Sequence, residues 1–204
     1  MINSSAILVI SGPSGAGKSS LINKISDKIG SYYFSISTTT RAPRGEEQNG
    51  REYYFVTKED FEKDIEANNF LEYATVHGNY YGTSMVPVKE ALNDGKLVIF
   101  DIDVQGQKIV TDKLSEITTS VFLTTPSLNE LNKRLYSRDT DDTEVIEKRL
   151  FQANEELEQI KHFDYLIVND NLDTAAQELL HVAYVARLKN SNEQTRIFID
   201  KWKR

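Results

Sequence analysis

The sequence predicts an α/β fold in which helices cover a parallel central sheet. Four short apolar runs have the character of buried strands and end in polar or glycine-containing stretches, at residues 6–10, 97–100, 120–123 and 165–168. Helical patterns lie between or after these runs, at residues 20–29, 104–112 and 172–188. Strands that alternate with helices are typical of this class, and its ligands bind at the carboxyl ends of the strands.

A glycine-rich loop follows the first predicted strand. It consists of Gly12, Pro13, Ser14, Gly15, Ala16, Gly17, Lys18 and Ser19, and a helical pattern begins at Ser20. With this spacing, backbone N–H groups turn toward phosphate oxygens, Lys18 reaches the β- and γ-phosphates, and the Ser19 hydroxyl can ligate Mg²⁺. The helix that follows adds the positive end of its dipole. A nucleotide site is therefore predicted here, and the alternative is a glycine turn without a ligand.

Composition restricts the class of protein. A chain of 204 residues with 39% hydrophobic residues fits one domain with elaborations. Its 24 Lys and Arg against 31 Asp and Glu give a net charge of −7, which argues against a general nucleic-acid or membrane binder. The absence of cysteine excludes disulfides and thiolate metal sites. The apolar run at residues 6–10 is too short for a signal sequence, so we expect a cytoplasmic protein.

Two stretches interrupt the alternation of strands and helices. Residues 35–82 are rich in Tyr, Phe and Thr, which predicts a small antiparallel insertion. Its expected strands are residues 52–56, 70–76 and 79–81, and its expected helix is residues 58–68 with Thr57 as the cap. Residues 127–161 have no strand signal, but Ser127 and Glu130 form a capping-box pattern ahead of polar helical sequence with three arginines. We interpret this second stretch as a helical lid with cationic residues.

Candidate metal ligands are few. Asp101 follows a buried strand, as does the carboxylate that holds the water shell of Mg²⁺ in enzymes with such a loop. His77, His162 and His181 lie far apart and have no ligand spacing. The only metal that we expect is therefore Mg²⁺ carried by a nucleotide.

Three further motifs carry a resemblance to a known family. They are Arg41-Ala42-Pro43-Arg44, Gly78-Asn79-Tyr80-Tyr81-Gly82 and Asp101-Ile102-Asp103-Val104-Gln105-Gly106. Together with the glycine loop and in this order, they resemble guanylate kinase from about Ile7 to Arg187. The resemblance implies a P-loop three-layer fold and ATP-dependent phosphorylation of GMP to GDP with Mg²⁺, in purine nucleotide metabolism and GMP recycling. It also implies these boundaries: a domain over 4–188 with core segments 4–36, 84–125 and 162–188, a GMP-binding insertion 37–83, a lid 126–161, and a tail 189–204.

Recognition of guanine can be argued from the residues as well. Guanine presents two adjacent donors, N1–H and the N2 amino group, so that one carboxylate can accept from both, and Glu72 is suited to this task. Without the family, Glu72 would be interpreted as a carboxylate on the solvent face of a strand. The resemblance places the hydroxyl groups of Ser37 and Thr83 beside the base. No residue clearly excludes a ribose without its 2′-OH, so dGMP is an expected substrate as well.

The phosphate of GMP needs cations and donors. Arg41 and Arg44 supply planar forks, and Tyr53 and Tyr81 each bring a phenol O–H, whereas we expect the neighbouring tyrosines 54 and 80 to pack. The GMP-binding residues implied by the resemblance are Ser37, Arg41, Arg44, Glu47, Tyr53, Glu72, Tyr81, Thr83, Asp101 and Asp103.

The lid supplies the side chains for ATP. Arg134 and Arg138 resemble the arginines that reach its phosphates, Arg149 resembles one that bridges both substrates, and Asn169 resembles a position on the adenine side. The family frequently has glycine where this chain has Asp139, which could pair with Arg138 and weaken its hold on ATP. The catalytic residues implied are Lys18, Arg41, Arg134 and Arg149, and ATP binding also involves residues 12–20 with Arg138 and Asn169.

Two alternatives remain open at this point. A non-catalytic guanylate-kinase-like module would serve as a protein-interaction surface, but it usually has a damaged glycine loop, whereas Lys18 and Ser19 are present here. A related kinase for a sugar phosphate would lack the guanine carboxylate at Glu72. The expected state is a monomer or a homodimer, and the basic, apolar end 196–204 is expected to dock on its own domain.

Overall fold

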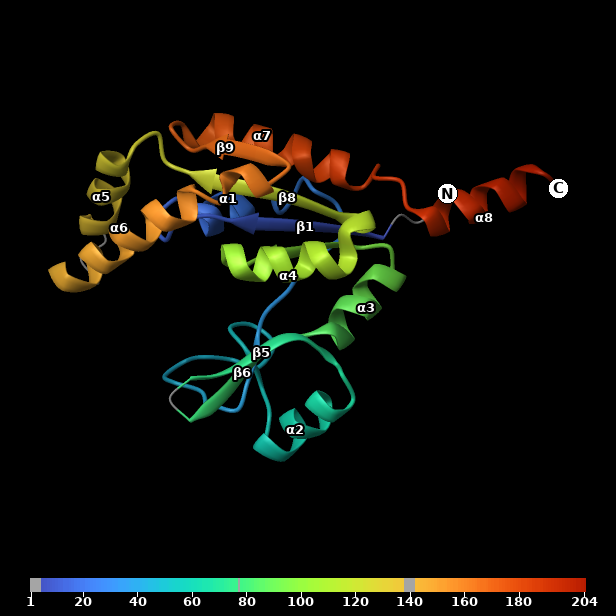
Figure 1. The fold of residues 1–204 in the computed structure, drawn as a ribbon, viewed down its shortest axis with the longest axis horizontal. Coiled ribbons are helices and arrows are strands. Elements are labelled where there is room, and N and C mark those ends of the chain that lie inside the picture. Colours follow the sequence, from blue (N-terminus) through green and yellow to red (C-terminus); the bar gives the residue numbers. More distant parts are fainter. Residues whose placement is uncertain (1–4, 77, 138–141) are drawn as a thin grey trace.

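The structure is a computed structural model that describes residues 5–76, 78–137 and 142–204, and two sheets organise it (Figure 1). Its elements in chain order are β1 (Ala6–Ser11), α1 (Lys18–Ile25), β2 (Tyr32–Phe34), β3 (Thr38–Thr39), β4 (Tyr54–Phe55), α2 (Lys58–Glu66), β5 (Phe70–Val76), β6 (Asn79–Ser84), α3 (Met85–Asn93), β7 (Leu97–Asp101), α4 (Val104–Leu114), β8 (Thr118–Thr124), α5 (Leu128–Tyr136), α6 (Thr143–Leu157), β9 (Tyr165–Val168), α7 (Leu172–Ala186) and α8 (Asn192–Trp202). Single 3₁₀ turns occur at Ser115–Ile117 and Ile160–His162.

The central sheet is parallel throughout, with the strand order β2-β7-β1-β8-β9. Side chains on β1 alternate between its two faces: Leu8 packs toward α1 and α7, and Val9 packs toward α3 and α4. Both side chains are fully buried, and burying one such residue stabilises the fold by roughly 1.5–3 kcal/mol. The predicted three-layer α/β architecture is confirmed, although the short strand β2 and the helix α3 were not predicted.

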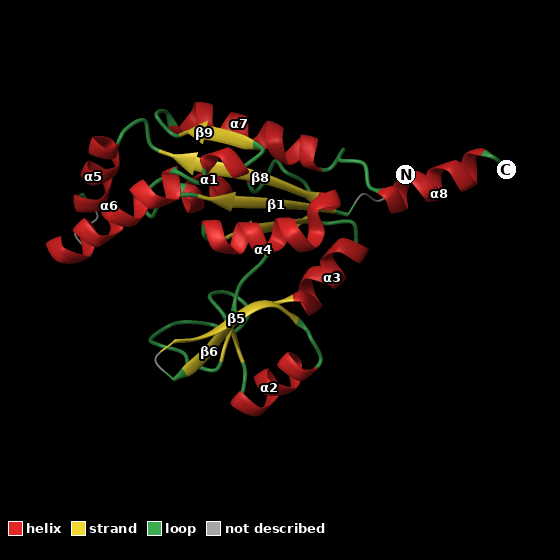
Figure 2. Cartoon of the chain, in the orientation of Figure 1, coloured by secondary structure: helices red, strands yellow, loops and turns green. Residues whose placement is uncertain are grey.

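The second sheet has the order β4-β3-β6-β5 and lies on the far side of α3 and α4 (Figures 1 and 2). Its β3–β6 and β5–β6 pairs are antiparallel, as expected for the insertion, although β3 was not among the predicted strands. The β3–β4 pair is parallel, with Thr38 opposite Tyr54, so the predicted antiparallel insertion also contains one parallel pair. The physical reason is the long connection over residues 40–53, which brings the chain back to run in the same direction.

A small apolar cluster stabilises this insertion. Phe61 on α2 is fully buried and stacks on Phe70 and Tyr80, with ring centroids 4.2 and 5.0 Å apart. The predicted cap of α2 forms, because the Thr57 hydroxyl accepts from the Asp60 backbone N–H at 3.1 Å. The insertion therefore has its own packed interior beside the main core.

The helices α5 and α6 lie in the stretch that was predicted to be a lid, and they pack on each other through Leu131, Leu135, Ile146 and Ala153. The predicted cap at Ser127 also forms, since its hydroxyl accepts from the Glu130 backbone N–H at 3.2 Å. In Figure 1 the strands β1 and β8 point toward these helices, so α5 and α6 lie at the carboxyl ends of the strands. The predictions for Arg138 and Asp139 lie outside the described residues.

The final helix, α8, contradicts the expectation that the tail docks on its own domain. It has no buried residue and projects away from the sheet (Figure 1). Near its first residues, Glu116 accepts a hydrogen bond from the Asn192 backbone N–H, whereas Phe198 and Trp202 are exposed. None of the helices that the structure describes is long and apolar enough to cross a membrane.

Candidate active site

The glycine-rich loop connects β1 to α1 in a backbone conformation that requires glycine. Gly12 has a φ of +137°, and a Cβ built there would lie 1.9 Å from the carbonyl oxygen of Leu123. Gly17 has a φ of +100°, and its Cβ would lie 2.4 Å from the Asn169 side-chain nitrogen. The chain therefore turns sharply at the end of β1 and starts α1 at Lys18, whose Nζ donates to the Gly12 carbonyl at 2.6 Å.

A cavity of about 380 Å³ opens beside this loop, and we call it the loop cavity. Lys18, Ser19, Asp101 and Asp103 are among its lining residues. The Lys18 Nζ lies 3.7 Å from Asp101 Oδ1. Burial raises the pKa of Asp101, and the nearby lysine opposes this shift. Asp103 caps α4, with its Oδ1 accepting from the Gly106 N–H at 2.8 Å, and this contact orients its carboxylate.

Glu156 on α6 also lines the loop cavity, although none of the sequence motifs predicts it. Burial raises the pKa of its carboxyl group; Lys18 opposes this shift and Asp103 adds to it. The carboxylate also borders a larger cavity of about 760 Å³ between α4 and α6. A signal existed in the sequence, because Glu156 follows Arg149 by two helical turns and therefore shares its face of the helix.

The predicted lid residues gather around the loop. Arg149 donates from Nη1 to the Ser14 hydroxyl at 3.1 Å. Arg134 donates from Nη2 to the Asn169 carbonyl at 2.9 Å, and its Nε bonds Glu130 at the same distance. The buried Asn169 side chain donates in turn to the Ala16 carbonyl at 2.8 Å. The loop, α5 and the end of β9 thus form one polar network.

The insertion brings the predicted base-binding residues together at the β5–β6 pair. Glu72 stands opposite Thr83, and the Thr83 hydroxyl donates to Glu72 Oε1 at 2.6 Å. Ser37 immediately precedes Thr38, which pairs with Gly82 beside Thr83. A carboxylate and hydroxyl groups therefore occupy one end of the insertion, as recognition of a donor-rich base requires.

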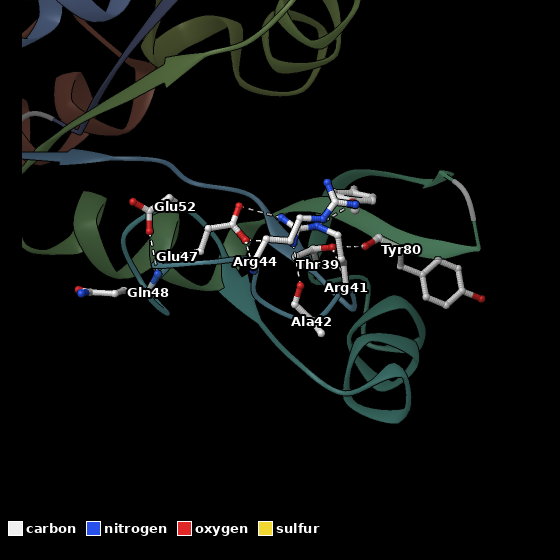
Figure 3. Close-up of polar contacts among 9 residues, drawn as sticks. Thr39, Arg41, Ala42, Arg44, Glu47, Gln48, Glu52 and Tyr80 are labelled. Carbon is white, nitrogen blue, oxygen red and sulfur yellow. Dashed lines mark hydrogen bonds and ion pairs between the residues drawn. The ribbon is translucent and has the colours of Figure 1, made fainter. Parts of the chain in front are cut away.

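Arg41 is held by several groups of the insertion (Figure 3). Its Nη1 and Nη2 each donate to one Glu47 carboxylate oxygen at 3.0 Å, and its Nε donates to the Tyr81 hydroxyl at 3.2 Å. Glu47 Oε2 also accepts from the Arg44 backbone N–H at 2.7 Å. These bonds lower the pKa of Glu47, chiefly through Arg41, and raise the pKa of Arg41. Glu47 thus contacts the two predicted phosphate-binding arginines rather than standing apart.

The four tyrosines of the insertion have different surroundings. The Tyr53 and Tyr81 rings meet edge to face at 6.0 Å, and the Arg41 guanidinium carbon lies 5.4 Å from the centroid of the Tyr53 ring. Tyr80 instead stacks on Phe61, in agreement with its predicted packing role. Tyr54 pairs with Thr38 in the β3–β4 ladder and is half-buried.

The loop cavity offers the oxygen donors that Mg²⁺ prefers. Ser19 presents an exposed hydroxyl, and Asp101 and Glu156 present carboxylate oxygens. Within the described ranges, no three His, Cys, Asp or Glu residues cluster closely enough to hold a metal ion alone. These donors fit an ion whose remaining ligands come from a nucleotide and water.

Comparison with known proteins agrees with this arrangement. The family model described as guanylate kinase matches residues 4–184. The chain is 55% identical over 197 residues to the guanylate kinase of Sulfurimonas denitrificans, covering 97% of this chain and 96% of that protein. It is 50% identical over 198 residues to the guanylate kinase of Wolinella succinogenes, covering 97% and 92%.

A solved structure gives the same result. The crystal structure of guanylate kinase from Anaplasma phagocytophilum matches with a TM-score of 0.66 and 29% sequence identity, covering 92% of this chain and 89% of that one. The match to the family model and the identity to these relatives extend over nearly the whole chain. The chain therefore belongs to the guanylate kinase family.

Proposed function

We propose that the protein transfers the γ-phosphoryl group of ATP to GMP, and to dGMP, which yields ADP and the corresponding diphosphate. The observation that carries this proposal is the Glu72–Thr83 pair in the insertion of a chain whose core has a complete phosphate-binding loop with Lys18. The first feature suits a guanine base and the second suits a nucleoside triphosphate. Neither an interaction module nor a sugar-phosphate kinase needs both.

Base selection follows from the acceptor character of Glu72. Its carboxylate can accept from guanine N1–H and from the N2 amino group, while Thr83 donates to one of its oxygens and fixes its orientation. Adenine presents an acceptor at N1, which would face the carboxylate with its own lone pair. A site built for two donors rejects the wrong base because its own polar groups would remain unpaired.

We assign residues 37–83 to the insertion. We assign the GMP phosphate to the end of the insertion that carries Arg41 and Arg44. Arg41 is held in a fixed fork by Glu47 and by the Tyr81 hydroxyl, so its orientation is set before a ligand arrives. The exposed Arg44 and the Tyr53 hydroxyl supply further donors from the same end of the insertion. This arrangement explains why an acidic chain can hold an anionic acceptor.

Transfer itself requires positioning and charge stabilisation rather than a base, because the attacking phosphate oxygen of GMP is already anionic. We assign Lys18 to the β- and γ-phosphates, with Arg149, which donates to Ser14 of the loop, and Arg134, which donates to the neighbouring Asn169. As charge spreads over the transferring oxygens, these cations bind them more strongly. We assign residues 126–161 to a lid whose closure excludes water that would otherwise accept the phosphoryl group.

Mg²⁺ would be held by the Ser19 hydroxyl directly and by Asp101 through water. When bound, it neutralises charge on the β- and γ-phosphates. We further propose a cytoplasmic location, because the bacterial relatives that the chain resembles are guanylate kinases, whose proposed substrates are intracellular nucleotides.

Coupled measurement of ADP release tests the function. The assay uses ATP and Mg²⁺ with GMP, AMP, CMP or UMP in separate reactions. Fast turnover with GMP alone supports both the reaction and the role of Glu72. ATP binding without turnover on any monophosphate would instead indicate an interaction module.

A further inference from the structure

Glu156 has a buried carboxylate oxygen that the described protein leaves unsatisfied. Its Oε2 is shielded from solvent and has no hydrogen-bond partner among residues 5–76, 78–137 and 142–204. Buried acceptors are nearly always paired, and beside a ligand cavity the missing partner can be a donor that arrives with the ligand. The side chain lines the loop cavity, where a triphosphate would lie under the proposed function.

The charges around this cavity define the kind of partner. Its charged lining residues are Lys18, Asp101, Asp103 and Glu156, which makes three acidic side chains against one cation. A triphosphate alone would be repelled by these carboxylates. A hydrated Mg²⁺ ion removes the conflict, because it adds positive charge and its water ligands are hydrogen-bond donors.

The position of Glu156 on α6 links it to phosphate binding. Arg149 and Glu156 are two turns apart on one face of the helix, and Arg149 already donates to Ser14 of the loop. The same helix face therefore presents a cation near the start of the loop and an acceptor within the cavity.

We propose that Glu156 is a positioning residue that accepts hydrogen bonds from the water shell of the Mg²⁺ ion bound with ATP. The helix α6 then contacts the hydrated metal through Glu156 as well as the phosphates through Arg149. The site therefore binds the magnesium complex of ATP more tightly than free ATP. This inference rests on the proposed binding of ATP at the glycine-rich loop.

The test is the equilibrium binding of ATP to the full chain by calorimetry, without GMP, in excess EDTA or in excess Mg²⁺. The variant Glu156→Gln removes the charge and keeps the shape, and Glu155→Gln is the matched control on an exposed neighbour outside the loop cavity. We expect Glu156→Gln to bind free ATP more tightly, because one repulsive charge is gone, and to bind the magnesium complex less tightly. The enhancement of ATP affinity by Mg²⁺ should fall about tenfold, as expected for the loss of one charge-assisted hydrogen bond.

The two affinities separate this role from a structural one. An equal fall in both affinities, or an enhancement equal to that of the parent, would overturn the role of Glu156. If the parent protein binds no ATP in either condition, the proposed nucleotide site itself is wrong. Should Glu156→Gln fail to fold, Glu156→Asp replaces it in the same comparison, because its shorter side chain withdraws the acceptor and keeps the charge. An unchanged enhancement of ATP affinity by Mg²⁺ in this variant would then overturn the proposal.

Discussion

Glu72→Gln is the sharpest perturbation of base recognition in this chain. Glu72 is half-buried, lies opposite Thr83 in the β5–β6 pair, and its Oε1 accepts a hydrogen bond from the Thr83 hydroxyl at 2.6 Å. Glutamine has nearly the same shape but replaces one acceptor oxygen with an NH₂ donor. If the remaining oxygen keeps the bond from Thr83, the new donor faces the N1–H and amino donors of guanine.

The size of the effect follows from the bonds involved. A hydrogen bond to a charged group contributes roughly 1.5–3 kcal/mol. The substitution removes one of the two proposed bonds from guanine to the Glu72 carboxylate and weakens the other, because the charge is lost. A loss of about 3 kcal/mol corresponds to a roughly 100-fold fall in kcat/KM for GMP. The corresponding value for ATP should change less than about threefold, because Glu72 lies in the insertion and not among the residues that line the loop cavity.

Coupled ADP release with GMP varied at saturating ATP, and then with ATP varied at saturating GMP, measures both values. The matched control is Glu66→Gln, which removes an exposed carboxylate from α2 in the same insertion and should change neither value. Equal losses for the two substrates, or an unchanged value for GMP, would refute the assignment of Glu72 to the base.

Three further substitutions test other parts of the site. Arg41→Lys cannot span both Glu47 oxygens and should raise KM for GMP roughly tenfold at unchanged KM for ATP; a parallel rise in both would place Arg41 elsewhere. Gly12→Ala should cost at least about 2 kcal/mol more in urea denaturation than Gly78→Ala, because both have positive φ but only Gly12 faces backbone atoms; equal costs would contradict this. Glu47 has a lowered pKa, so its stabilisation is present above the ordinary carboxyl pKa of about 4.3 and is lost as the pH falls through the lowered value. The stability difference between the parent and Glu47→Gln should therefore vanish in acid, and a difference that persists there would show that the ion pair is not its source.

Local sequence was enough to predict the main elements of the core. The apolar runs that became β1 and β7 are buried on both faces and need no specific partner to be recognised as strands. The cap at Thr57 and the glycine-rich loop were also predictable, because both depend on residues within a few positions of each other.

Long-range geometry was the part that sequence could not supply. The parallel β3–β4 pair depends on the path of the chain between Thr39 and Tyr54, and the Arg41–Glu47 fork depends on how two long side chains meet. The apolar residues of α8 have the composition of a docking surface, but Trp202 is exposed in the structure. The local sequence of the helix does not specify which surface it would pack against. Glu156 could be placed on the helix face of Arg149 from sequence alone, but its position beside Lys18 and Asp101 could not, because those residues lie far away in sequence.

Direct phosphoryl transfer between the two nucleotides is tested most plainly with ATP labelled in its γ-phosphoryl group. With GMP and Mg²⁺ present, the label should appear in the β-phosphate of GDP in step with ADP formation, and almost none should appear as inorganic phosphate. Lys18→Ala should slow this transfer by roughly 100-fold or more, because Lys18 is the cation that lines the loop cavity and is proposed to bind the transferring group. Label that accumulates as inorganic phosphate at the rate of ADP formation would contradict transfer to GMP in a closed site.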